Sequence, residues 1–252
     1  MDLNILVFVL VGFIAQMIDG ALGMAYGVSS NTFLLSIGIP PAAASASVHM
    51  AEVVTTGISG FSHWKLENID KELIKRLVIP GVIGGVVGAY LLTEVPADII
   101  KPIVSAYLLI MGVVILFKAI RVGEILKGIP VYVTFLGLIG GFFDAIGGGG
   151  WGPIVTTTLM ARGTHPRFTI GSVNFSEFFV TFAESVTFIL ALRLAFFEEF
   201  WTIIIGLLIG GAIAAPLAAV VTKKLPTRGL MAMVGVLIII LSIRTIYMVF
   251  AG

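Results

Sequence analysis

An internal repeat constrains this chain more than any other feature of its sequence. When the sequence is shifted by 125 positions, polar and glycine positions coincide without a gap from Gly12 to about Leu92. The coinciding pairs include Asp19 with Asp144, Glu52 with Glu177, Pro41 with Pro166, Gly23 with Gly148 and Gly27 with Gly152. Chance matches apolar residues in a hydrophobic chain, but it does not align acids, prolines and glycines in one register. The repeat therefore predicts two homologous halves, 1–121 and 122–252, that form one domain together.

Composition places both halves in a lipid bilayer. Hydrophobic residues make up 58% of the 252 and charged residues only 12%, about half the usual share. With 15 basic and 14 acidic residues, the chain cannot cover the surface of a soluble domain of this size. The net charge of +1 argues against nucleic-acid binding. Without cysteine there are no disulfides and no thiolate metal ligands.

Each half contains five apolar segments. In the first half they are Leu3–Met17, Tyr26–Ile37, Pro41–Phe61, Leu73–Leu92 and Ile99–Lys118, and in the second Val131–Phe143, Trp151–Ala161, Thr169–Leu192, Glu199–Thr222 and Leu230–Phe250. The first two of each half fall short of the roughly 20 residues that a membrane-spanning helix needs. Glycine-rich stretches, Asp19–Gly23 and Asp144–Gly150, separate these short pairs. We therefore expect an all-α integral membrane protein whose halves each begin with a broken or re-entrant helical hairpin.

Basic residues predict how the halves lie in the membrane. They gather in four loops, around Lys65–Arg76, Lys118–Lys127, Arg162–Arg167 and Lys223–Arg228. These loops share the cytoplasmic side only if each half crosses the membrane an odd number of times. The halves are then antiparallel, as in the inverted repeats of secondary transporters. We expect a multi-pass protein of the plasma (inner) membrane with both termini outside, and a short interfacial helix over Lys65–Arg76.

Polar residues form a stripe along the third segment of each half. Ser45, His49, Glu52, Thr56 and Ser59 have helical spacing, and Asn174, Glu177, Thr181 and Glu184 repeat it in the second half. The stripes either line one cavity or serve as hydrogen bonds between helices. Buried carboxyl groups in the membrane carry protons or, alternatively, ligate sodium. His49 either titrates or forms a neutral hydrogen bond with Glu52.

The two breaks are the expected anion site. Asp19 and Asp144 either contact a substrate or coupling ion there or cap the half-helices that follow. No lysine or arginine lies at the centre of a long segment, so an anion would depend on N–H groups at helix N-termini. We place a small anion between Gly20–Gly27 and Ala145–Gly152, with Tyr26 and Trp151 either walling the site or packing in the core.

The expected substrate-binding residues are Gly23, Tyr26, Gly27, His49, Gly148, Gly149, Trp151, Gly152 and Asn174. The expected coupling residues are Asp19, Glu52, Asp144, Glu177 and Glu184. No cofactor and no metal site are expected, because no metal-binding motif of histidines and acids is present. The motifs Gly81-X-X-X-Gly85 and Gly206-X-X-X-Gly210 predict close helix packing, either between the repeats or at a homodimer interface.

Three motifs resemble the sulfite exporter TauE/SafE family, also called the 4-toluene sulfonate uptake permeases. They are Ile146-Gly-Gly-Gly-Gly-Trp-Gly-Pro153, Ser59-Gly-Phe-Ser-His63 followed by Glu67-Asn-Ile-Asp70, and Pro80-Gly-Val-Ile-Gly-Gly-Val-Val-Gly-Ala89. The resemblance spans essentially the whole chain and implies a plasma-membrane carrier of sulfur oxyanions or organosulfonates. The charged positions His49, Glu52 and Glu177 depart from the family pattern and indicate a proton-linked variant or a different anion.

Three function classes follow from these features. The leading hypothesis is a secondary transporter of small anions, proton-coupled and working by alternating access. A passive anion channel would show the same inverted repeats and buried acids. An intramembrane enzyme is the weaker alternative, since Glu177 and Glu184 are two helical turns apart and no nucleophile–base pair is evident. No ATP-binding motif is present.

Overall fold

The computed structural model describes residues 4–22, 24–120, 132–221 and 227–251, and all regular elements within them are helices. The first half contains α1 (Ile5–Leu22), α2 (Tyr26–Ser36), α3 (Pro41–Lys65), α4 (Lys71–Glu94) and α5 (Ala97–Ile120). The second contains α6 (Val133–Gly147), the π-helix η1 (Gly152–Thr156), α7 (Thr157–Ala161), α8 (Pro166–Val221) and α9 (Thr227–Ala251). The predicted all-α fold is confirmed.

The long helix α8 is two helices joined at one residue. Arg193 has φ 62° and ψ −177°, which no helix contains. The shift of 125 positions relates Arg193 to Asn68, which lies in the turn between α3 and α4. The parts of α8 before and after Arg193 are thus the counterparts of α3 and α4, as the segments of the second half predicted.

The predicted interfacial helix over Lys65–Arg76 is wrong. α3 continues to Lys65, and α4 begins at Lys71 after a short turn. The Asp70 carboxylate accepts hydrogen bonds from the backbone N–H groups of Glu72 (2.9 Å) and Leu73 (3.2 Å). This cap starts a helix that runs on into the apolar part of α4, so no separate helix forms.

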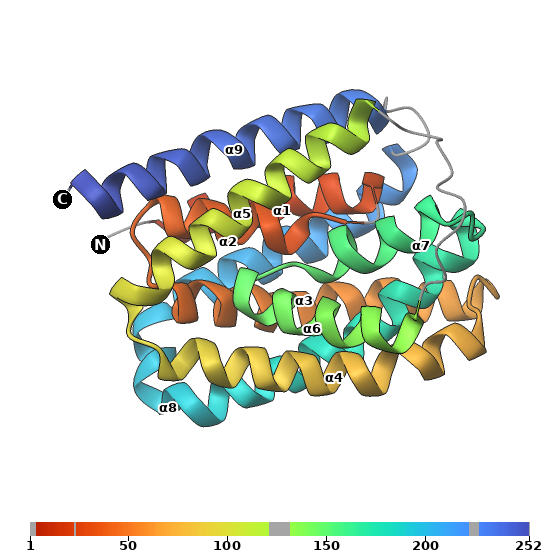
Figure 1. The fold of residues 1–252 in the computed structure, drawn as a ribbon, viewed down its shortest axis with the longest axis horizontal. Helices are drawn as coiled ribbons and strands as arrows, with labels where there is room; N and C mark the ends of the chain where they lie inside the picture. Colours follow the sequence, from red (N-terminus) through yellow and green to blue (C-terminus); the bar gives the residue numbers. More distant parts are fainter. Residues whose placement is uncertain (1–3, 23, 121–131, 222–226, 252) are drawn as a thin grey trace.

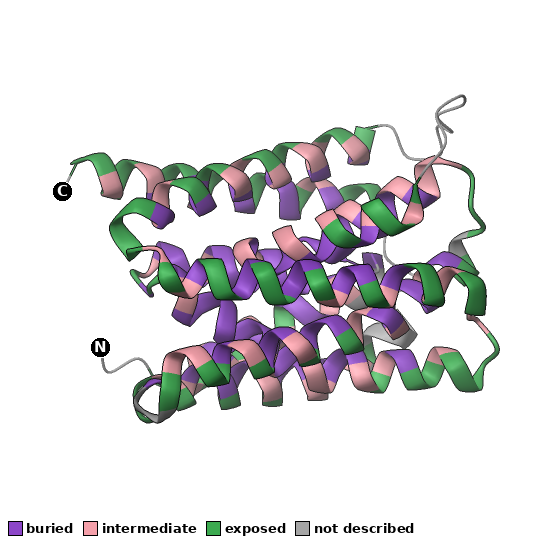
Figure 2. Cartoon of the chain, turned by 60° about the horizontal axis from the view of Figure 1, so that its bottom comes forward, coloured by how far each residue is buried: buried purple, intermediate pink, exposed green. Residues whose placement is uncertain are grey.

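The described helices make this a multi-pass membrane protein. Five of them are long and apolar enough to cross a bilayer: Lys71–Glu94, Ala97–Ile120, Arg167–Arg193, Phe196–Ala215 and Arg228–Ala251. α3 has 25 residues, but its polar stripe lowers its hydropathy. Exposed residues cover the outer faces of the bundle and buried residues its interior (Figure 2), and the exposed set includes many large apolar side chains.

Each half packs its first helix against the other half. α1 lies on the second part of α8, where an added Cβ at Gly210 would be 2.0 Å from the Val9 carbonyl oxygen. α6 lies on α4, where an added Cβ at Gly141 would be 2.1 Å from the Gly81 carbonyl oxygen. The two glycine motifs therefore pack between the repeats, where only glycine permits the approach. A homodimer remains a prediction.

Equivalent helices of the two halves also contact each other in reverse order. The hydroxyl oxygens of Thr56 and Thr181, which the repeat matches, are 3.5 Å apart. Beyond them, Gly57 lies against Phe178 and Gly60 against Phe175. Residue numbers thus rise along α3 while they fall along its partner, and the two helices are antiparallel.

The turns gather at the two ends of the bundle (Figure 1). The α3–α4 and α7–α8 turns lie at one end, joined by hydrogen bonds from Arg167 to Asn68 and Leu66. The start of α1 and the end of α9 lie at the other end. Lys65 and Arg167 are thus together, as predicted, whereas the predicted partners Arg121 and Lys223 lie outside the described residues. Which end faces the cytoplasm remains a prediction.

Candidate functional site

The glycine break of the second half is an ordered turn between α6 and η1. Gly148 and Gly149 have φ of 64° and 145°, which side chains other than glycine rarely adopt. Two side chains of the first half hold the end of α6. The Asn31 amide donates to the Gly147 carbonyl at 2.5 Å, and the Ser45 hydroxyl donates to the Ala145 carbonyl at 2.5 Å. The repeats are therefore locked together at this break.

Both aspartates at the breaks have the geometry of helix caps. Asp144 Oδ1 accepts hydrogen bonds from the N–H groups of Gly150 (2.6 Å) and Trp151 (2.8 Å). Asp19 Oδ1 accepts from the Tyr26 N–H at 3.3 Å, at the start of α2. The sequence predicted that backbone N–H groups at this break would bind an anion. In the structure, the N–H groups of Gly150 and Trp151 instead donate to a carboxylate of the protein itself.

The structure brings the two breaks into backbone contact. An added Cβ at Gly27 would lie 2.4 Å from the Gly148 carbonyl oxygen, and one at Gly149 would lie 2.2 Å from the Val28 nitrogen. Gly152 is buried in η1. Gly23, the counterpart of Gly148, lies outside the described residues. At the predicted anion position between the breaks, the described residues are therefore in tight backbone contact with one another.

The paired aromatic residues beside the breaks are fully buried in the core. The Tyr26 hydroxyl donates to the Leu207 carbonyl (3.1 Å), and the Trp151 indole N–H donates to the Val173 carbonyl (3.2 Å). Their rings lie against Gly211 and Gly81, respectively. Packing, one of the two roles considered for them, explains their burial.

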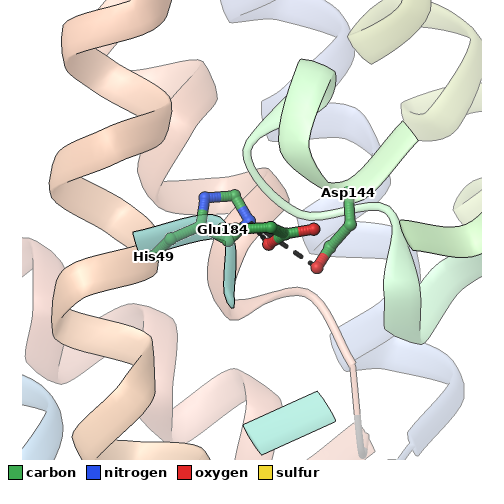
Figure 3. A group of neighbouring side chains, drawn as sticks. All are labelled: His49, Asp144 and Glu184. Atoms are coloured by element: carbon green, nitrogen blue, oxygen red, sulfur yellow. Dashed lines mark ion pairs between the residues drawn. The ribbon is translucent and has the colours of Figure 1, made fainter. Parts of the chain in front are cut away.

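A triad of ionisable side chains from different helices lies buried inside the bundle, and Figure 3 shows the three side chains close together. His49 of α3 places Nε2 2.8 Å from Glu184 Oε2 of α8 and 3.6 Å from Asp144 Oδ2 of α6. All three side chains are at most 1% exposed. His49 Nδ1 lies 2.8 Å from the Ser45 carbonyl oxygen on its own helix. The central triad, His49, Asp144 and Glu184, thus joins three helices from both halves.

The central triad corrects one expectation about His49. Of the two alternatives for His49, the neutral bond to Glu52 on the same helix is wrong, because its carboxyl partners are on other helices. Titration of His49 stays a prediction. Glu52 is 4% exposed, and its Oε2 has no hydrogen-bond partner within the described residues. Its counterpart Glu177 is half-buried.

A second polar pair links the same two helices near the other end of the stripe. The Asn174 amide donates to the Ser59 hydroxyl at 3.0 Å. Asn174 is buried, and its role in substrate binding stays a prediction. The structure thus brings His49 together with Asp144 and Glu184, and it sets Asn174 apart with Ser59.

The central triad offers three ligand atoms that lie within 4.8 Å of one another and could face a metal ion. Two ligands on a tetrahedral metal with bonds of about 2.0 Å are about 3.3 Å apart. The His49 Nε2 to Glu184 Oε2 distance of 2.8 Å is shorter and is that of an ion pair in direct contact. The geometry therefore favours a direct contact between these two side chains over a shared metal ion.

Sequence reasoning missed two residues that border the second break. Tyr107 stacks on Phe143 with ring centroids 5.2 Å apart, and its hydroxyl is buried without a hydrogen bond among the described residues. Lys118 was counted as a loop charge, yet its ammonium group donates to the Pro153 carbonyl at 3.3 Å. That carbonyl lies in η1, where the π-helix replaces the regular α-helical hydrogen bonds. The π-helix has no signature in the sequence that could have indicated this contact.

A cavity of about 590 Å³ opens where the α3–α4 and α7–α8 turns meet. Asp70, Lys71, His165 and Thr169 are among the residues that line it. Its lining contains none of the predicted substrate-binding or coupling residues.

Comparisons with known proteins agree with a transport role. The family described as "Sulfite exporter TauE/SafE" matches residues 8–245. The chain is 43% identical over 250 residues to a Bacillus subtilis (strain 168) protein named "Probable membrane transporter protein YtnM", across 96% of this chain and 83% of that protein. No solved structure matches the chain.

Proposed function

Because the chain belongs to the sulfite exporter TauE/SafE family, we propose that this membrane transporter is a proton-coupled secondary transporter of small anions. The proposed substrates are sulfur oxyanions or organosulfonates, which the family description and the earlier resemblance favour. The proposed location is the plasma membrane, with both termini outside. An enzyme activity is not proposed, since the family and the relative are both described as transporters.

The observation that carries the proposal is the burial of the central triad where the two halves meet. Ionisable side chains are rare inside membrane proteins and mark ion or substrate pathways there. His49, Asp144 and Glu184 come from three helices and are at most 1% exposed. A purely structural bundle would gain nothing from this arrangement, because burying charge is costly.

The break beside Asp144 supports the choice of an oxyanion. Two backbone N–H groups there already hold the oxygen of a carboxylate. A sulfonate or sulfite offers the same kind of acceptor to the same donors. We propose that the substrate competes with Asp144 for these donors, and that opening of the contact between Gly27 and Gly148 admits it. Gly23, Gly149, Trp151, Gly152, Tyr26 and Asn174 remain proposed members of the site.

The packing of the two halves supports alternating access as the proposed transport mechanism. α3 and the first part of α8 are antiparallel counterparts, and α1 and α6 each pack on the opposite half. These contacts support the proposal that the halves form an inverted repeat, in which one half can rock against the other around a central site. The central triad lies where such a site would be.

Reconstituted vesicles test the proposal. We expect a permanently charged small alkylsulfonate, and sulfite, to accumulate when the lumen is more alkaline than the medium. A channel would let the anion equilibrate but would not accumulate it against its own gradient. Sodium coupling would instead appear as a loss of accumulation when choline replaces sodium.

Variants of the paired acids test their proposed coupling role. Glu52→Gln and Glu177→Gln keep the side-chain shape but cannot pass a proton on through the bundle, so we expect accumulation driven by the pH gradient to be lost. Exchange of anion across the membrane without a gradient serves as the control for folding. Full gradient-driven accumulation in both variants would show that these acids are structural.

A further inference from the structure

The repeat relates a charged pair and a neutral pair on the same two helices. A shift of 125 positions takes His49 to Asn174 and Ser59 to Glu184. In the structure His49 contacts Glu184 at 2.8 Å, and Asn174 contacts Ser59 at 3.0 Å. The two contacts are therefore the same contact in the two halves, on opposite sides of the Thr56–Thr181 contact. Only one of them can titrate.

The partners of His49 fix the number of protons in the charged pair. Nδ1 lies 2.8 Å from the Ser45 carbonyl oxygen, which can only accept, so Nδ1 carries a hydrogen. The Ser45 hydroxyl gives its own proton to the Ala145 carbonyl and does not compete. Nε2 is then either a bare lone pair or a donor. A bare Nε2 lone pair and a carboxylate oxygen repel each other at 2.8 Å, so one of the two groups must carry a further proton.

The charge of the pair is zero in either case. An imidazolium with a carboxylate and a neutral imidazole with a carboxylic acid have the same sum. When the proton leaves, a nitrogen lone pair faces a carboxylate oxygen, and the charge becomes −1. Nothing then holds the two atoms at 2.8 Å, so the contact between α3 and α8 must open there.

We propose, building on proton-coupled transport as the function, that the His49–Glu184 pair is the site that binds the coupled proton, one per transport cycle. Asn174 and Ser59 are its counterpart in the other half and bind none. The proton enters between His49 Nε2 and Glu184 Oε2 and leaves from the same place. The repeat relates the two contacts, yet only the one between His49 and Glu184 can bind a proton.

The charges around the pair explain why its proton and a substrate anion would travel together. Asp144 of α6 lies 3.6 Å from His49 Nε2. Glu52 of α3 interacts electrostatically with both members of the pair, and Glu177 of α8 interacts with Glu184. Asp19 of α1 interacts with Glu52 and Glu177. All are acids, so loss of the proton adds a negative charge to an acidic centre. An anion entering beside Asp144 meets less repulsion when the pair is protonated. Proton and anion therefore move in the same direction.

A single substitution separates coupling from transport. Glu184→Gln has an amide that donates to Nε2 permanently, which mimics the protonated pair. Exchange of an alkylsulfonate between vesicle lumen and medium at equal pH is measured alongside and reports how much anion the variant still moves. Its accumulation ratio under a gradient of one pH unit should fall from about tenfold to about one, since one proton per anion gives a tenfold ratio per unit. The matched control is Glu72→Gln, which removes an exposed carboxylate of α4, and it should keep the tenfold ratio.

Gradient-driven accumulation that persists in Glu184→Gln would overturn the assignment of the proton. Failure of the parent protein to move sulfite or any alkylsulfonate would instead contradict the proposed function. In that case the protonation of the His49–Glu184 pair can still be measured without any substrate.

Nitrogen NMR of the three histidines reads the pair directly. With ¹⁵N-labelled histidine, His49 is assigned by the signal that His49→Gln removes. We expect Nδ1 to be protonated and Nε2 to share a proton with the carboxyl group, and the shared signal to become that of an ordinary neutral imidazole in Glu184→Gln. A His49 signal with the proton on Nε2 alone and a bare Nδ1 would overturn the proposal. So would a stoichiometric metal ion in the purified protein that Glu184→Gln loses.

Discussion

The two oxygens of the Asp144 carboxylate serve different neighbours. Oδ1 accepts two backbone hydrogen bonds at the second break, and Oδ2 faces His49 at 3.6 Å. Asp19 has the same place in the repeat but accepts one longer hydrogen bond and is only half-buried. The two equivalent aspartates therefore make unequal hydrogen-bonding contributions at their breaks.

This inequality predicts unequal losses of stability. Asp144→Ala leaves two buried N–H groups without an acceptor, so we expect a loss of about 2–3 kcal/mol in the free energy of unfolding. Asp19→Ala should cost about 0.5–1 kcal/mol. Chemical unfolding in detergent measures both, with Asp144→Asn as a partial rescue because its amide oxygen still accepts. Equal losses for the two alanine variants would contradict the capping role of Asp144.

Single residues also mark where sequence reasoning ends. The repeat and the helical spacing identified His49, Glu52, Glu177 and Glu184 as ionisable residues within membrane helices. They could not identify the partner of His49, because the repeat matches Glu184 with Ser59 and matches neither with His49. The pairing follows from the antiparallel crossing at Thr56 and Thr181, which is a tertiary fact. Once that crossing is known, residues before Thr56 must meet residues after Thr181.

At the scale of elements, the second break shows why glycine occupies it. Gly149 combines a φ of 145° with a backbone neighbour, the Val28 nitrogen, 2.2 Å from where a Cβ would lie. The surrounding contacts are backbone atoms of α2, which cannot rotate away as a side chain can. The break and α2 therefore form one rigid unit between the halves.

Gly149→Ala should therefore be far more damaging than an alanine elsewhere in the bundle. We expect a loss of about 3 kcal/mol, combining overpacking with a strained φ. Gly57→Ala is the control, because its Cβ would meet only the Phe178 ring at 3.3 Å, and it should change stability by less than about 1 kcal/mol. Melting temperatures in detergent compare the two. Similar melting temperatures would mean that the break can rearrange freely.

The helices themselves were largely predictable, because apolar segments and glycine breaks repeat at one offset. The turn at Asn68 and the Arg193 break of α8 fall at matched positions for this reason. The prediction of an interfacial helix was wrong because a cluster of charged residues does not by itself indicate a separate helix. In the structure the same charges belong to a turn, a cap and the first turn of α4.

At the scale of the whole molecule, the turns lie at two opposite ends of the bundle. The end at which each turn lies predicts its side of the membrane. Lys65 and Arg167 lie at the end where the α3–α4 and α7–α8 turns meet, and Asp98 lies at the start of α5, beside the α4–α5 turn. Basic residues favour the cytoplasmic side. The arrangement thus predicts that Asp98 faces outward together with both termini.

Cysteine labelling tests this topology without removing any native residue, since the chain has no cysteine. Lys65→Cys and Asp98→Cys are both at exposed positions, so accessibility depends on the side of the membrane and not on packing. A membrane-impermeant maleimide added to intact cells should label position 98 strongly, and it should label position 65 only after the cells are permeabilised. Labelling after permeabilisation controls for the reactivity of each cysteine. Strong labelling of position 65 in intact cells would reverse the orientation, and equal labelling of both positions would mean that the two ends do not lie on opposite sides of the membrane.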